Sequence, residues 1–111
     1  MENIDNETKK KISKLQMLEQ KLQSMAMQKQ MFQTQSMESE NALKEIDSSN
    51  DTYKVIGNVM ISVDKTKLKE ELLSKKEMGN IKVDNLEKEE KKLREEATEL
   101  QKEVMESMKN E

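Results

Sequence analysis

The sequence predicts a mainly α fold, a long antiparallel coiled-coil hairpin whose two helices are joined by one central β-hairpin. Two long, charged segments without proline flank one short apolar stretch, residues 53–63. Within it, Gly57 and Asn58 separate two runs of β-branched residues, and a two-residue turn of this kind reverses the chain. The second segment must then run back along the first, and residues 1–111 are expected to form a single domain.

The composition favours a coiled coil over a globule. The chain has 111 residues, of which 32% are hydrophobic and 39% are charged, and its aromatic residues are Phe32 and Tyr53. That is too little apolar material for a compact core. A disordered chain can have the same composition, but here the charges are mixed and the apolar residues recur periodically, which is typical of long helices.

Several classes of function are disfavoured by residue content. Twenty Lys and Arg against 23 Asp and Glu give a net charge of −3, so no basic face indicates nucleic acid. The chain has no Cys and no His, which removes thiol chemistry, the usual general base and the commonest metal ligand. The Asp residues do not follow a calcium-loop pattern. We therefore expect no enzyme activity and no catalytic, cofactor or metal site.

The expected location is the cytoplasm. The first residues lack the basic and apolar regions of a signal peptide, and nowhere are there about 18 consecutive apolar residues. The lack of Cys favours a reducing compartment. No membrane interaction is expected.

The first helix is expected over residues 5–48. Its apolar residues recur at alternating steps of three and four, which is the pattern of a coiled-coil seam: Ile4, Leu15, Leu18, Leu22, Met25, Phe32, Leu43 and Ile46. The same register places polar residues at core positions, namely Lys11, Lys29, Ser36 and Ser39. The cluster at 47–51 consists of residues that compete with helical hydrogen bonds, so it should end this helix.

The β-hairpin is expected over residues 52–63 and the second helix over residues 66–109, with Asp64 or Thr66 as its N-cap. The second seam consists of Leu72, Val83, Leu86, Leu93, Ala97, Leu100 and Val104, and it is interrupted by Lys76, Gly79 and Glu90.

Folding the chain at the turn aligns the two seams. The aligned pairs are Leu15 with Leu100, Leu22 with Leu93, Phe32 with Val83, and Leu43 with Leu72. The agreement of two separately identified seams supports the fold-back. Ser36 then meets Gly79, a glycine that should cost about 1 kcal/mol inside a helix. A close approach, a flexible joint or a tolerated weak spot would each explain this glycine.

The hairpin is the expected assembly site. An isolated two-stranded hairpin is marginal in water, and its edges can pair with other strands. Alternation puts Val59, Ile61 and Val63 on one face and Met60 and Ser62 on the other. We expect it to join a β-barrel formed between subunits through Tyr53, Val55, Ile56, Val59, Met60, Ile61 and Val63. The alternative is a hairpin that packs only on its own helices.

The chain resembles the prefoldin subunits. The resemblance rests on Tyr53-Lys54, the Gly57-Asn58 turn and the apolar strand 59–63 between two coiled-coil arms, and it covers essentially the whole chain. A single hairpin indicates the beta class, because alpha-class subunits are expected to carry two. The resemblance implies an ATP-independent chaperone, a hexamer of two alpha and four beta subunits that holds unfolded proteins at its coiled-coil tips. It also implies delivery of those proteins to a group II chaperonin.

The residues expected to contact unfolded proteins lie at the tip, where the fold-back brings the two ends of the chain together. They are Ile4, Ile12, Leu15, Val104, Met105 and Met108. Methionine suits this role because its side chain adapts to varied shapes. The alternative, favoured for Leu15 and Val104, is that these residues only close the last turns of the coil.

Two further alternatives concern the whole chain and its outer surface. The chain could be a structural or adaptor coiled coil that binds one folded partner. Four methionines lie off the first seam, Met17, Met27, Met31 and Met37, and they could line a binding surface or serve only as good helix formers.

Overall fold

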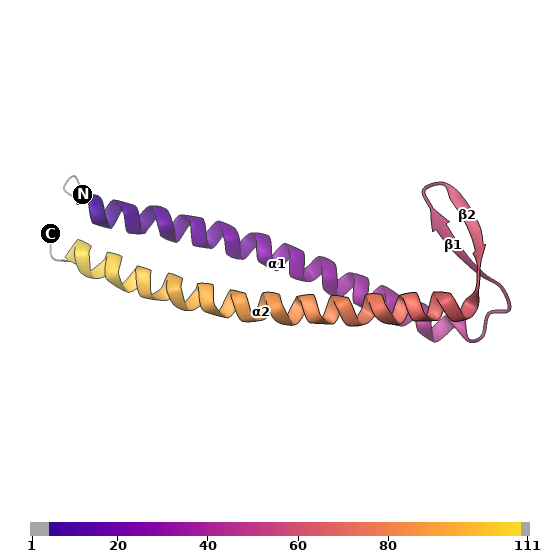
Figure 1. The fold of residues 1–111 in the computed structure, drawn as a ribbon. Helices are drawn as coiled ribbons and strands as arrows, with labels where there is room; N and C mark the ends of the chain where they lie inside the picture. The colour runs from indigo at the N-terminus through magenta and orange to yellow at the C-terminus, as the bar shows by residue number, and fades with distance from the viewer. Residues whose placement is uncertain (1–4, 110–111) are drawn as a thin grey trace. The chain divides into compact units, whose positions relative to one another are not determined.

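The fold consists of two long helices and one β-hairpin. The computed structural model describes residues 5–109, with α1 at Asn6–Ile46, β1 at Thr52–Ile56, β2 at Val59–Val63 and α2 at Lys65–Lys109 (Figure 1). This order confirms the mainly α class with one antiparallel β-hairpin. None of the described helices combines the length and the apolarity that crossing a membrane requires.

The first helix ends two residues before the expected position. The N–H groups of Ser48 and Ser49 donate to the carbonyl oxygens of Glu45 and Ile46, three residues earlier in each case. Bonds of this span tighten the last turn and end the α-helical pattern. The hydroxyl of Ser48 adds a bond of 2.9 Å to the Glu45 carbonyl oxygen. The expected competition between these side chains and the helix is therefore what the structure shows.

Two compact units can be distinguished along the chain, each containing part of both helices. We call them the terminal unit, Met1–Lys29 with Asn85–Glu111, and the hairpin unit, Gln30–Asp84.

In the terminal unit the two helices run antiparallel, with the start of α1 beside the end of α2 (Figure 1). Their seam residues are the least exposed apolar side chains of this unit, and the most buried are Leu18, Met25, Leu100 and Val104. Asp5 caps α1, because its Oδ1 accepts a hydrogen bond of 2.7 Å from the Thr8 N–H. Hydrogen bonds from Thr8, first from its side chain and then from its backbone N–H, hold the pKa of the Asp5 carboxyl below its ordinary value.

In the hairpin unit the helices approach closely at Ser36 and Gly79. A Cβ on Gly79 would collide with Ser36 Oγ and lie 3.2 Å from the Phe32 carbonyl oxygen. The Ser36 hydroxyl donates across the seam to the Lys76 carbonyl oxygen at 3.2 Å. Of the three explanations for Gly79, the structure supports the close approach. Small residues at these two positions are what permit it.

The hairpin has a regular antiparallel register from Thr52 opposite Val63 to Ile56 opposite Val59. Gly57 begins the turn with a φ of 61°, a conformation that glycine adopts without steric cost. Because residues opposite one another share a face, two faces follow. The lysine face consists of Thr52, Lys54, Ile56, Val59, Ile61 and Val63. The tyrosine face consists of Tyr53, Val55, Met60 and Ser62. The expected alternation along residues 59–63 is confirmed.

Candidate assembly and client-binding sites

The hairpin exposes apolar side chains on both of its faces. On the tyrosine face, Val55 and Met60 are 65% and 66% exposed, and on the lysine face Ile61 is still 43% exposed. Tyr53, Ile56 and Val59 are also exposed, and Val63 is half-buried. Its own helices therefore do not cover the hairpin, contrary to the alternative considered above. An apolar patch of this kind, on a sheet with two open edges, is typical of an interaction site.

The base of the hairpin is closed by a buried hydroxyl. Thr52 is 9% exposed, and its Oγ1 donates a hydrogen bond of 2.7 Å to the Val63 carbonyl oxygen. An apolar side chain at position 52 would leave the Val63 carbonyl oxygen without this hydrogen bond. The sequence marks this position only by a single threonine before Tyr53, and the pairing with Val63 becomes visible only in the three-dimensional register.

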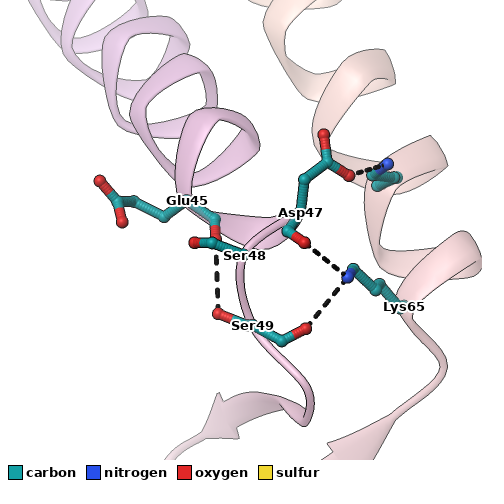
Figure 2. A network of polar contacts seen from close by, with 6 residues as sticks. Glu45, Asp47, Ser48, Ser49 and Lys65 are labelled. Atoms are coloured by element: carbon teal, nitrogen blue, oxygen red, sulfur yellow. Dashed lines mark hydrogen bonds and ion pairs between the residues drawn. The ribbon is translucent and has the colours of Figure 1, made fainter.

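A lysine from α2 caps the end of α1 beneath the hairpin. Figure 2 shows Lys65 Nζ donating to the carbonyl oxygens of Asp47 and Ser49, at 3.1 and 3.0 Å. Lys69 forms an ion pair with the Asp47 carboxylate, and this bond holds the pKa of Asp47 below its ordinary value. Carbonyl groups at a helix C-terminus lack intrahelical donors, and a cation there supplies them. The network ties the end of α1 to the start of α2 at the point where the hairpin begins.

A second lysine links the hairpin to α2. Lys54 is the only charged residue within residues 52–63, and its Nζ lies 2.6 Å from Glu71 Oε1. Lys75 Nζ lies 3.6 Å from the same oxygen. The hydrogen bond from Lys54 is the main reason why the pKa of Glu71 lies below its ordinary value. Glu71 therefore stays ionised opposite the one charge that the hairpin carries.

The structure distinguishes among the tip residues that are expected to contact unfolded proteins, which we call clients. Val104 is buried, while Leu15, Ile12 and Met108 are half-buried. Met105 is 70% exposed and lies with Met108 along one shallow hollow near the end of α2. Ile4 lies outside the described residues. Val104 and Leu15 thus belong to the seam. Among the described residues that are expected to contact clients, Met105 has the most accessible side chain.

The terminal unit contains a buried ion pair that the periodicity of the sequence does not predict. Glu90 is 2% exposed, and its Oε1 lies 2.9 Å from Lys29 Nζ. Arg94 Nη2 lies 3.5 Å from Oε2, which accepts no hydrogen bond within the part of the chain that the structure describes. Each residue interrupts the apolar seam of its own helix, and their opposite charges are the sequence signal that could pair them.

The four off-seam methionines lie on the exposed surface of α1.

Among residues 5–109, no three His, Cys, Asp or Glu side chains are grouped as metal ligands. An open hollow of about 610 Å³ in the hairpin unit is lined by Phe32, Leu72, Met78 and Gly79, among others. Lys82 also lines this hollow, and its Nζ lies over the Phe32 ring, 4.7 Å from the ring centre.

Comparison with known proteins identifies similar chains. A family model described as "Prefoldin subunit" matches residues 9–111. The prefoldin subunit beta of Thermococcus onnurineus is 35% identical over 103 residues, covering 90% of this chain and 89% of the relative. That of Thermococcus gammatolerans is 34% identical, covering 98% and 96%. The crystal structure of the prefoldin beta subunit from Thermococcus strain KS-1 matches with a TM-score of 0.80 and 32% identity, over 96% of each chain.

Proposed function

Because this chain belongs to the prefoldin family of chaperone subunits and is similar to prefoldin beta subunits, we propose that it holds unfolded proteins without ATP. The observation that carries this proposal is the apolar hairpin between the two helices, which is exposed on both of its faces. The hairpin then serves as the assembly element, and the two helices are free to contact other proteins.

The hairpin is the assembly element. Several such hairpins close into a β-barrel shared by subunits, which satisfies the open strand edges and covers the apolar faces. We infer a hexamer in which four copies of this chain combine with two alpha subunits. The alpha subunits, with a second hairpin each, complete the platform.

The client site is the end of the terminal unit. Met105, Met108 and Ile12 lie beside the seam there, and they offer adaptable apolar surface to a non-native chain. Ile4, Leu15 and Val104 complete the set of residues that we assign to client contact. Bound clients are then passed to a group II chaperonin in the cytoplasm. None of these steps requires nucleotide, metal or a catalytic group.

Removal of the tips tests the client assignment. A chain lacking residues 1–12 and 101–111 should still assemble with an alpha subunit, because the hairpin unit is untouched. It should no longer suppress the aggregation, followed by light scattering, of a client diluted from denaturant. Equal protection by the truncated and intact complexes would show that clients bind elsewhere.

A further inference from the structure

The lysine face of the hairpin presents a physical problem for assembly. Lys54 lies directly opposite Ile61 in the register, with Ile56 and Val59 on the same face. If other hairpins cover this face, the ammonium group loses water. Removing an unpaired ammonium group from water is costly, and the cost is offset only where an opposite charge lies close by with good geometry.

Glu71 supplies that opposite charge from α2. Its Oε1 lies 2.6 Å from Lys54 Nζ, a distance typical of a charge-assisted hydrogen bond. The Lys54 and Glu71 side chains are 37% and 38% exposed in the single chain, so each still has water to lose on assembly. Lys75, one helical turn further along α2, lies 3.6 Å from the same carboxylate oxygen and holds it from the helix side.

We propose that Glu71 is a positioning residue for assembly, the counter-ion that allows the lysine face to be buried against the β-hairpins of partner subunits. This inference rests on the proposed function, since it requires the hairpin to be the assembly element. Glu71 itself need not touch a partner. It acts through Lys54, whose side chain it directs toward α2.

The charge balance also indicates what covers the face. A free Lys54 would suit an acidic partner. With Glu71 bound to it, the charge of Lys54 is balanced within the chain, and the rest of the face consists of Thr52, Ile56, Val59, Ile61 and Val63. A neutral, β-branched surface beside two open strand edges is complementary to another β-hairpin of similar composition.

The experiment is a double-mutant cycle on assembly. The chain, with its substitutions, is titrated with a prefoldin alpha subunit, and the concentration at which half the protein is assembled is measured by native mass spectrometry. Glu71→Gln keeps the size of the side chain and leaves Lys54 without its carboxylate. We expect this concentration to rise by about tenfold or more, because one charge is then buried without its partner.

The double variant Lys54→Met/Glu71→Gln tests whether Glu71 acts through Lys54. Methionine retains the length of the lysine stem without its charge, so no counter-ion is needed. In the Lys54→Met background, Glu71→Gln should change the assembly midpoint by less than about twofold. Glu70→Gln, at the exposed neighbouring position, is the matched control and should assemble as the wild type does. Circular dichroism of each chain checks that the helices form.

Two results would overturn the inference. One is a Glu71→Gln chain that assembles at the wild-type concentration. The other is a Glu71→Gln defect of the same size with and without Lys54, which would mean that Glu71 acts on assembly by another route. Ile61→Asp, measured in the same series, tests the hairpin as the assembly element separately from the role of Glu71. If Ile61→Asp abolishes assembly while Glu71→Gln does not alter it, the hairpin remains the assembly element and only the role of Glu71 falls.

Discussion

Lys29 and Glu90 meet inside the seam of the terminal unit, with Nζ and Oε1 2.9 Å apart. The Lys29 side chain is 24% exposed and that of Glu90 is 2% exposed. Burying a carboxylate costs several kcal/mol, and a close cation offsets much of that cost. The pair is therefore one interaction: either residue alone would be a defect in the seam.

Removal of Lys29 alone should destabilise the coil. Lys29→Met leaves the Glu90 carboxylate buried with only the longer contact to Arg94, so the free energy of unfolding should fall by about 3 kcal/mol. Lys29→Met/Glu90→Leu removes both charges and should be as stable as the wild type or more so. Urea unfolding followed by circular dichroism measures both values.

The exposed ion pair between Lys21 and Glu89 is the matched control. Its Nζ and Oε1 are 3.8 Å apart, with side chains 58% and 53% exposed. Lys21→Met should therefore cost less than about 1 kcal/mol. Equal losses for Lys29→Met and Lys21→Met would contradict the account of a buried pair.

Gly79→Ala should destabilise the hairpin unit although alanine is the better helix former. The added methyl group collides with Ser36 Oγ and crowds the Phe32 carbonyl oxygen. Overpacking of this kind costs about 1–3 kcal/mol, against a gain in helix propensity of about 1 kcal/mol. A lower melting temperature than the wild type is expected, and Ser36→Ala in the same chain should recover part of the loss.

The exposed position next to Gly79 separates packing from propensity. Asn80→Ala meets solvent on the helix surface, so it should leave the melting temperature unchanged or raise it. If Gly79→Ala raised the melting temperature as well, the close approach of the two helices would not be a constraint.

Two carboxylates at the base of the hairpin should make the stability of the chain depend on pH. The pKa values of Asp47 and Glu71 lie below their ordinary values of 3.8 and 4.5, chiefly because of hydrogen bonds from Lys69 and Lys54. A lowered pKa in the folded chain gives stability that is present above the ordinary value and is lost as pH falls through the folded value. Melting temperatures from pH 6 down to pH 3 should therefore fall, and Asp47→Asn/Glu71→Gln should flatten this fall. A parallel fall in the double variant would place the pH dependence elsewhere.

Met105 and Met17 allow a matched test of the client site. Both lie in the terminal unit, and they are 70% and 69% exposed. Met105→Asp should reduce the suppression of client aggregation severalfold, because it puts a charge on the apolar surface that we assign to clients. Met17→Asp should have little effect. Equal losses would indicate that clients bind along the outer side of α1 as well.

The periodic features of this molecule could be predicted from the sequence, and the specific polar contacts between side chains could not. Alternating steps of three and four identified both seams, and Gly57-Asn58 identified the reversal, because each is a local pattern. The ion pair of Lys29 with Glu90 required both seams at once, since each residue taken alone is only an interruption. The fold-back placed Gly79 opposite Ser36, but the choice among the three explanations for this glycine required the distance between the two residues.

The functional sites were predictable to different degrees for the same reason. The apolar hairpin stands out because charge is nearly missing from a chain that is otherwise highly charged. Glu71 does not, because it is one of 23 acidic residues and acquires its significance only by lying beside Lys54. At the tip, periodicity placed Val104 in the seam and Met105 beside it, which agrees with their burial, while the assignment of either to clients stays a prediction.

Native mass spectrometry with a prefoldin alpha subunit is the measurement that decides whether the hairpin assembles this chain with its partners. Ile61→Asp puts a charge on the lysine face, and Met37→Glu puts the same charge on an exposed apolar position of α1 in the same unit. We expect a hexamer of two alpha subunits and four copies of this chain for the wild type and for Met37→Glu. We expect Ile61→Asp to lose that hexamer while its helices still form. A coiled-coil dimer that forms equally with or without the alpha subunit, and with or without Ile61→Asp, would contradict assembly through the hairpin. It would favour an adaptor that binds through its helices.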